Sequence, residues 1–350
     1  MLVLRPARLS DLGDLMEISR AVGTGMTSMP ANEGAWVEKL TRSVESFGKD
    51  AVEGPGGEVY FLVLEDTEKQ KAIGTTAIYA GVGLQTPFYS YKLSTLTTAS
   101  TVLQKTKHTR ILSLVNDYTG TTEIGSLYLS PDYRKPGVGQ FLSRSRYLMM
   151  RDFPERFGDL VIAEMRGYQT DEGRSPFWDN LGEKFFGIAF ENADKISAVE
   201  GTQFISDLMP KYPIYMDLLP QEAQEVIGKP HKSSSPALKL LEKEGFAWRG
   251  YVDVFDGGPS VECHRSSIRT IQHSRDGLVR DFRELEPAED ASNLYIVTNR
   301  KREGYRLALI PMELSREDDG SCSVHMSADS ARGLKLAEGD AVAFCPFKIR

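Results

Sequence analysis

The residues best suited to chemistry lie in one short segment, in which Arg134 and Lys135 precede two glycines, Gly137 and Gly139. Glycine lacks a Cβ, so a ligand can closely approach the backbone amides of such a loop. The pattern predicts that a helix begins here, and the unpaired amides of a helix N-terminus favour an anion. With two cations beside these amides, the segment is predicted to cradle a pyrophosphate.

Two common phosphate loops do not fit this segment. It is too short for a P-loop and lacks the GK[ST] ending, and no third glycine follows to complete the dinucleotide pattern GxGxxG. What remains is R-x-x-G-x-G between a strand and a helix. From the loop alone, a solvated glycine-rich turn explains the pattern as well as a binding site does.

The elements that must position this loop follow from hydrophobic periodicity and turn residues. Residues 81–110 give no clear pattern, and prolines interrupt a mostly helical stretch from about 175 to 245. We expect strands at residues 2–4, 60–64, 72–80, 111–115, 123–129, 160–165 and 251–255, and helices from residue 12, at 36–47 and at 140–153.

Residues 1 to about 265 contain a series of distinctive motifs, which are GMTSMPANE, VLED, NDYTG, LYLSPDYRK, VIAEMRG, GRSPFW, DLMPKYPIY, EVIGKPH and GYVDVFDGGPS. Through these motifs the sequence resembles the arginine N-succinyltransferase family of the GCN5-related N-acetyltransferase superfamily. The order of strand, helix, hairpin, motif strand, glycine loop, helix and buried strand is also the order that the superfamily shows.

The resemblance implies an α+β fold: a mixed sheet like that of the GCN5-related N-acyltransferases, flanked by helices, with helical insertions and a small β-rich C-terminal module. We predict an acyl-CoA N-acyltransferase domain over residues 1–265 with a helical insertion at about 175–245. Residues 266–292 are charged and are predicted to be a linker, and residues 293–350 form the module.

The activity that the resemblance implies is transfer of succinyl from succinyl-CoA to the α-amine of L-arginine, the first step of succinyl-dependent arginine breakdown in bacteria. The products would be N2-succinyl-L-arginine and CoA. Succinyl-CoA would be a cosubstrate, and no permanently bound cofactor is expected. Two alternatives stay open: the same fold with ornithine, another amine or acetyl-CoA as substrate, and a non-catalytic CoA-binding subunit beside an active paralogue.

The resemblance also assigns residues to this activity. Leu127 corresponds to the family's succinyl-CoA-binding strand residue and His231 to its proposed proton donor, whereas on their own they are a plain strand residue and one of five histidines. An imidazole with a pKa of about 6.5 suits proton transfer near neutral pH. The predicted donor-binding residues are Leu127, Leu129, Arg134, Lys135, Gly137, Val138 and Gly139.

Binding of the acceptor needs carboxylates, since bidentate pairing is the strongest recognition mode of a guanidinium. The succinyl carboxylate in turn needs a cation, and Arg166 is a candidate. The sequence does not choose among the carboxylates in the family-like segments, which are Glu33, Asp117, Glu123, Glu164 and Asp256.

Composition and cysteine spacing argue against several other classes of function. A net charge of -7 over 350 residues argues against nucleic acid as the main partner. Cys263, Cys322 and Cys345 show neither disulfide-framework nor metal-ligand spacing, and Cys263 is predicted to be a buried structural thiol rather than a nucleophile. Without a signal-peptide layout or a membrane-length apolar run, we expect a cytoplasmic protein with no membrane partner. A homo-oligomer or a paralogous subunit is left open.

Overall fold

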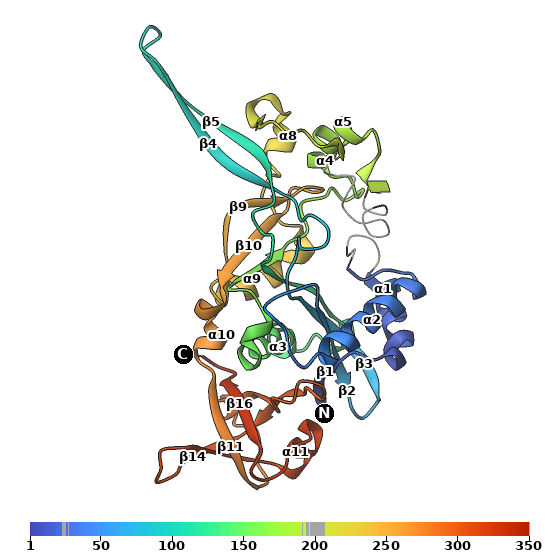
Figure 1. Ribbon diagram of the computed structural model, residues 1–350, viewed down its shortest axis with the longest axis vertical. Helices are drawn as coiled ribbons and strands as arrows, with labels where there is room; N and C mark the ends of the chain where they lie inside the picture. Colours follow the sequence, from blue (N-terminus) through green and yellow to red (C-terminus); the bar gives the residue numbers. More distant parts are fainter. Residues whose placement is uncertain (23–25, 27, 191, 194–195, 197–206, 350) are drawn as a thin grey trace. The chain divides into compact units, whose positions relative to one another are not determined.

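The computed structural model (Figure 1) describes residues 1–22, 26, 28–190, 192–193, 196 and 207–349. The chain divides into two compact units. Unit 1 comprises Met1–Ala80, Ile124–Asp159 and His264–Arg350, and unit 2 comprises Gly81–Glu123 and Leu160–Cys263.

Unit 1 is built on strands hydrogen-bonded in the order β14-β15-β11-β16-β12-β13-β1-β2-β3-β6. Its strands are β1 (Leu2–Pro6), β2 (Val59–Asp66), β3 (Lys71–Tyr79), β6 (Thr122–Leu129), β11 (Arg275–Phe282), β12 (Leu294–Thr298), β13 (Leu307–Pro311), β14 (Glu313–Arg316), β15 (Cys322–Met326) and β16 (Ala341–Pro346). Its helices are η1 (Leu9–Asp11), α1 (Leu12–Val22), α2 (Glu33–Gly48), η2 (Pro131–Tyr133), α3 (Val138–Asp152), η3 (Pro154–Arg156), η6 (Arg265–Ser267), α10 (Arg269–Gln272) and α11 (Ala328–Leu334).

The N-terminal part of unit 1 follows the predicted pattern closely. β2 and β3 form the expected antiparallel hairpin, and α2 covers it with the fully buried Trp36, whose ring meets Phe61 edge-on at 5.2 Å. Trp36 Nε1 donates to Ser19 Oγ of α1 at 2.9 Å, so the polar end of the indole is satisfied inside the core. Between α1 and α2, residues 23–25 and 27 lie outside the described residues.

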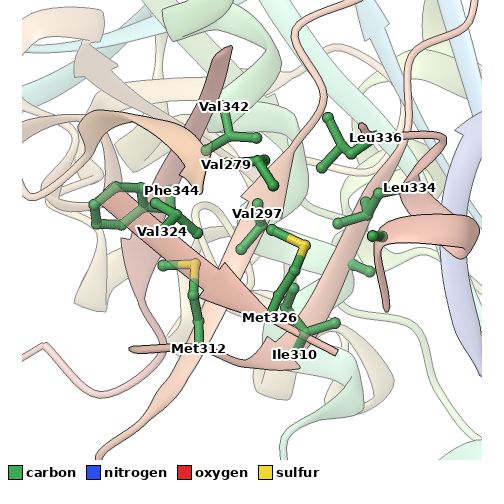
Figure 2. Packing of buried hydrophobic residues seen from close by; sticks show 12 residues of the cluster. Val279, Val297, Ile310, Met312, Val324, Met326, Leu334, Leu336, Val342 and Phe344 are labelled. Carbon is green, nitrogen blue, oxygen red and sulfur yellow. The ribbon is translucent and has the colours of Figure 1, made fainter. Parts of the chain in front are cut away.

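The predicted linker at residues 266–292 is wrong in one respect, because it contains strand β11. This strand pairs in parallel with β15 and antiparallel with β16, and Val279 lies in the core of the C-terminal module. Figure 2 shows this core, which also contains Val297, Val324 and Phe344. The outward residues of β11 are mostly charged, so the strand resembled a connection in the sequence.

The C-terminal module continues the sheet of unit 1. β13 pairs antiparallel with β1, with Val3 opposite Ala308 and Leu4 opposite Leu307. Helix α3 also contacts the module through Arg144, which is 2% exposed and donates to the carbonyls of Pro346 and Phe347 at 3.0 and 2.7 Å. The module is therefore part of the unit that holds the glycine loop.

The last residue of α3, Asp152, carries a buried carboxylate. Asp152 has a fully buried side chain that accepts from Thr298 Oγ1 at 2.6 Å, and Arg151 and Arg300 lie 3.5 and 3.7 Å from its Oδ1. Burial raises the pKa of Asp152 to about 6, and the neighbouring hydrogen bonds and cations offset only part of this rise. Ionisation of Asp152 therefore costs the folded state free energy.

Changing Asp152→Asn is expected to reduce the loss of stability on raising the pH. The folded pKa lies above the unfolded one, so the group's contribution is fully present below pH 4 and is lost between about pH 4 and 6. Two pKa units correspond to about 3 kcal/mol. Between pH 4 and 8, urea unfolding should show the free energy of unfolding of the wild type falling by up to this amount relative to that of the variant. If the two proteins showed the same dependence on pH, the raised pKa of Asp152 would be contradicted.

Unit 2 contains the hydrogen-bonded run β7-β10-β9-β4-β5-β8, with the first two residues of β6 parallel to β7. Its strands are β4 (Ser90–Ser100), β5 (Lys105–Val115), β7 (Leu160–Glu164), β8 (Ile214–Tyr215), β9 (Ala247–Asp253) and β10 (Pro259–His264, whose last residue belongs to unit 1). Its helices are α4 (Pro176–Asn180), α5 (Gly182–Phe186), η4 (Met216–Leu218), α8 (Gln221–Gln224), η5 (Lys232–Ser234) and α9 (Ser235–Lys243).

The core of unit 2 forms where its strands meet the short helices. The buried Phe177 of α4 meets Tyr91 of β4 edge-on at 6.1 Å, beside Val252 of β9. The predicted helical insertion at about 175–245 contains these short helices and the two-residue strand β8, and part of it lies outside the described residues. Residues 81–110, which gave no pattern in the sequence, contain most of the long β4–β5 ribbon.

The predicted α+β class, a mixed sheet flanked by helices, is confirmed in both units. Among the described residues, no helix is both long enough and apolar enough to cross a membrane.

Candidate active site

The glycine loop of unit 1 connects β6 to α3. The Ser130 N–H donates to the Ile73 carbonyl at 2.8 Å, which fixes the end of β6 beside β3. The chain then passes through η2, and Gly137 caps α3 with φ of 90°, a backbone conformation that favours glycine. The predicted strand, loop and helix are therefore confirmed, and the glycine at position 137 is required by the turn itself.

The start of α3 presents unpaired backbone amides. The first turn is closed by Val138 N–H to Lys135 O at 3.2 Å and Phe141 N–H to Gly137 O at 2.9 Å. Within the described part of the chain, the N–H groups of Gly139 and Gln140 donate to no protein acceptor. A Cβ at Gly139 would meet nothing within 4 Å, so the space in front of these amides is open. This is the arrangement that a helix offers to a phosphate.

The two predicted cations flank this helix start, and both are exposed. Arg134 Nε donates to the Leu129 carbonyl at 3.0 Å, so its guanidinium also holds the end of β6. For Lys135, the structure gives no ion pair among the described residues, which leaves its ammonium available to an anion. The loop therefore combines exposed amides, positive charge and open space.

Strand β6 carries an unusual backbone conformation just before the predicted donor-binding leucines. Ser126 has φ of 52°, which costs a non-glycine residue roughly 1–3 kcal/mol. Thr75 Oγ1 donates to the Ser126 carbonyl at 2.8 Å, and Tyr79 Oη lies 3.1 Å from Ser126 Oγ. These contacts hold the strained residue, while the following Leu127 and Leu129 stay partly exposed. Sequence reasoning missed Ser126, because serine gives no signal for a positive φ.

His231 belongs to unit 2, at the N-cap of η5. Its backbone N–H donates to the Arg166 carbonyl at 2.7 Å, and its Nδ1 accepts from the Ser233 N–H at 3.2 Å, with Ser233 Oγ 2.7 Å away. Because Nδ1 accepts, we assign the neutral tautomer with hydrogen on Nε2. Burial, Arg166 and Lys232 all lower the pKa of His231, so the neutral form is favoured at pH 7.

Three of the five candidate carboxylates lie together in unit 2. Glu164 at the end of β7 has Glu123 and Asp256 as electrostatic neighbours, and Asp253, which the sequence did not single out, joins them. Glu33 instead lies in the first turn of α2 in unit 1. Asp117 sits in the 116–120 turn and accepts from Tyr251 Oη at 2.9 Å. Of the five carboxylates considered for binding a guanidinium, the structure thus brings Glu123, Glu164 and Asp256 together.

Burial and mutual repulsion keep this group from ionising easily. Burial raises the pKa of Glu164 well above its ordinary value, and the charges of Asp253, Glu123 and Asp256 raise it further. Burial and then Asp253 raise the pKa of Asp256 to about 8. Glu164 Oε1 accepts from Ser260 Oγ at 3.3 Å. A cation brought to Glu164 would relieve the repulsion and favour its charged form.

Asp256 connects the carboxylate group to the segment of His231 through backbone hydrogen bonds. Its Oδ2 accepts from the Gly167 N–H at 2.6 Å and its Oδ1 from the Gly258 N–H at 2.9 Å. Gly167 also forms a bridge with Pro230, next to His231. The segments around Gly167, Pro230 and Asp256 meet here, and we call this place the Gly167 crossing. A Cβ at Gly167 would lie 2.4 Å from the Asp256 carbonyl oxygen, so only glycine fits at this position. Three distant segments therefore hold His231 near the carboxylate group.

Two further candidates can be placed. Arg166 Nη2 donates to Gln169 Oε1 at 2.5 Å, and its buried Nε has no partner among the described residues. Cys263 is 6% exposed, and burial raises the pKa of its thiol to about 11. The thiolate is therefore scarce at neutral pH, in keeping with a structural thiol. Over the described ranges, no set of three or more His, Cys, Asp or Glu side chains has a geometry suited to a metal ion.

The predicted residues fall on both units. Leu127, Leu129 and the loop from Arg134 to Gly139 belong to unit 1, whereas His231 belongs to unit 2. A separate hollow in unit 1, lined by Arg5, Phe47 and Tyr305 among others, contains none of them.

Comparison with known proteins identifies the class. Residues 2–270 match the family model described as arginine N-succinyltransferase beta subunit. The arginine N-succinyltransferase of Yersinia enterocolitica is 40% identical over 343 residues, covering 98% of this chain and 96% of that protein. That of Escherichia coli strain 55989 is 39% identical over 342 residues, covering 98% and 96%. The solved structure of arginine/ornithine succinyltransferase subunit AI from Pseudomonas aeruginosa matches with a TM-score of 0.88 and 33% identity, covering 100% of this chain and 99% of that one.

These full-length likenesses, together with the donor loop, define an acyltransferase, and they confirm the predicted fold class. The chain belongs to the arginine N-succinyltransferase family.

Proposed function

We propose that the protein transfers succinyl from succinyl-CoA to the α-amine of L-arginine, giving N2-succinyl-L-arginine and CoA. The observation that carries the proposal is the open start of α3, where the amides of Gly139 and Gln140 lack protein partners beside Arg134 and Lys135. Membership of the arginine N-succinyltransferase family supports the identity of both substrates.

In this proposal the donor binds to unit 1. The amides of Gly139 and Gln140 bind the pyrophosphate of succinyl-CoA, and Arg134 and Lys135 neutralise its charge. The partly exposed strand residues Leu127 and Leu129 contact the pantetheine arm, with Gly137 and Val138 shaping the turn between strand and helix. Succinyl-CoA is consumed as a cosubstrate, so the reaction itself calls for no permanently bound group.

The reaction forms a carbon–nitrogen bond and breaks the thioester carbon–sulfur bond. An α-amine has a pKa of about 8, so part of it is neutral near pH 7.5 and can attack the thioester carbonyl. The tetrahedral intermediate then expels the CoA thiolate, and the nitrogen gives up a proton while the sulfur gains one. We assign Nε2–H of His231 to hydrogen bonding at the departing sulfur. Transfer of a proton to the sulfur uses the imidazolium form, which returns to the neutral tautomer with hydrogen on one ring nitrogen.

The acceptor binds at the carboxylate group of unit 2. Asp256 is already engaged with backbone amides, so we assign Glu164 to the cationic groups of L-arginine. Arginine binding favours the charged form of Glu164, so affinity should rise with pH as Glu164 loses its proton. Arg166 is the cation that we assign to the succinyl carboxylate.

The variant Glu164→Gln tests the acceptor site. We expect KM for L-arginine to rise by about tenfold or more, because a hydrogen bond to a charged group contributes about 1.5–3 kcal/mol. KM for succinyl-CoA should stay within twofold, and the pH dependence of the arginine KM should flatten. Asp117→Asn is a matched control, since that exposed carboxylate lies in a turn. Equal arginine KM values for wild type and Glu164→Gln would rule out this role.

The proposed function is tested by calorimetric binding of succinyl-CoA, followed by thiol release with L-arginine, L-ornithine and other amines, and with acetyl-CoA as the other donor. Release that is fastest with succinyl-CoA and L-arginine supports the proposal. Faster release with ornithine or acetyl-CoA would select the alternative substrates. Binding without release for any pair would select a non-catalytic CoA-binding subunit.

We further propose a cytoplasmic enzyme that assembles from several subunits and needs neither nucleic acid nor a membrane. The matched family model is described as a beta subunit and the Pseudomonas aeruginosa structure as subunit AI, which supports such an assembly. Whether the subunits are identical copies or paralogues is decided by their mass and composition after purification.

A further inference from the structure

The β4–β5 ribbon of unit 2 extends beyond every strand that supports its base. At its base β4 pairs with β9 through Ser90–Lys92, and β5 pairs with β8 through Ile111 and Leu112. Beyond those points the two strands pair with each other up to Ser100 and Lys105, and the ribbon projects from the rest of its unit (Figure 1). A two-stranded ribbon with solvent on both faces is marginally stable in water.

Beyond its base, the ribbon buries no large apolar side chains. Along the distal strands the cross-strand neighbours are mostly threonine, serine and lysine, and residues 97–108 are exposed except for the half-buried Ser100. Its tip carries two large aliphatic side chains, Val102 and Leu103, which are 90% and 69% exposed. Solvated aliphatic groups at the end of a polar arm are suited to filling a pocket on another protein.

A second apolar group lies beside the base of the ribbon. Tyr212 and Leu218 flank β8, the strand that pairs with β5, and they are 85% and 81% exposed. With Val102 and Leu103 they are the four most exposed large hydrophobic side chains of the described residues. These four side chains therefore lie at the two ends of the ribbon, two at its tip and two beside its base.

The charge of the ribbon is opposite to that of the remaining chain. Residues 81–116 contain Lys92, Lys105, Lys107 and Arg110 and no carboxylate. Because the whole chain carries -7, the remaining residues carry -11. The body of a second copy of this chain therefore carries a net charge opposite to that of the arm, whereas two basic ribbons placed side by side would repel each other.

We propose that the β4–β5 ribbon, with its Val102–Leu103 tip and the adjoining Tyr212 and Leu218, is an arm that docks on the body of a second copy of this chain. This inference rests on the proposed multi-subunit assembly but not on acyl transfer. The tip supplies apolar anchors, and the exposed Lys105 sets the orientation against the oppositely charged body of the partner copy, whereas Lys107 already pairs with Asp217 of its own chain at 2.9 Å.

The test compares molar masses by light scattering for the wild type and two variants. In one variant, Asn-Gly joins Leu96 to Thr109 in place of residues 97–108; these flanking residues are already cross-strand partners, so the register is kept. The other combines Val102→Asp with Leu103→Asp at exposed positions. We expect the wild type at a multiple of 39.0 kDa and each variant at the mass of its own single chain, with cooperative thermal unfolding that shows the variants to be folded.

A matched control and a charge variant complete the experiment. Leu9→Asp introduces a carboxylate at a 52% exposed leucine of unit 1 and should keep the wild-type mass. Lys105→Glu should raise the dissociation constant of the assembly by about tenfold or more. Wild-type mass in the shortened variant would overturn the proposal, as would a monomeric wild type or a ribbon-dependent absorbance at 260 nm from bound nucleic acid. Thiol release on the same samples reports separately on the proposed reaction.

Discussion

Replacing His231 by alanine is expected to lower kcat for CoA release by about 100- to 10,000-fold, the range that one positioned acid or base contributes. The expected cause is loss of the Nε2–H donor, which the Ser233 N–H fixes by occupying Nδ1. The Kd for succinyl-CoA should change less than twofold, because the donor loop belongs to unit 1. Stopped-flow detection of the free thiol measures the first quantity and calorimetry the second.

Two controls separate chemistry from structure in this experiment. His231→Ala keeps the backbone N–H that donates to the Arg166 carbonyl, so the crossing of segments around Gly167 should persist and the melting temperature should hold. Ser233→Ala removes Oγ beside Nδ1 but keeps the Ser233 amide, and should cost much less activity. A fall in kcat of less than fivefold for His231→Ala, with folding intact, would remove the imidazole from the reaction.

The variant Gly139→Asp is expected to weaken binding of succinyl-CoA by about 100-fold. A carboxylate placed about 4 Å from the pyrophosphate repels it by between 1 and 4 kcal/mol, depending on the local dielectric. Position 139 has ordinary helical geometry and open space around the added Cβ, so the substitution should fold. Calorimetric titration at two salt concentrations should show the loss shrinking as salt screens the charges.

Gly139→Ala is the matched control, since it adds the Cβ without charge and should cost less than about fivefold. Gly137→Asp is a poorer test. Its φ of 90° strains any side chain, and the new Cβ would lie 3.0 Å from the ring of Phe347. If Gly139→Asp bound the donor as tightly as wild type, the α3 amides could not be the pyrophosphate site.

The sequence predicted the local structure of the glycine loop well because its signals are local. A glycine before a helix, two adjacent cations and an alternating strand are each visible within a few residues, and the structure has all of them in place. Ser126 could not be predicted, because its positive φ depends on hydrogen bonds with Thr75 and Tyr79 of a neighbouring strand.

The grouping of the carboxylates with His231 was only partly predictable, because its geometry is not local. Glu164, Asp256 and His231 come from segments that meet through the Gly167 crossing, which no spacing in the sequence reveals. Asp253 was missed for the same reason. The strands of the β4–β5 ribbon were also not predicted, because a strand pair with solvent on both faces has no alternation of apolar and polar residues.

The pairing of β13 with β1 has a consequence for any attempt to work with a shortened protein. Removing the C-terminal module would strip β1 of one hydrogen-bonded neighbour and uncover Val3 and Leu4, which are now fully buried. Such a fragment would display a bare apolar strand edge, the feature through which chains aggregate. Insolubility of that fragment would therefore reflect the exposed edge of β1 and would not show that the glycine loop is unstable.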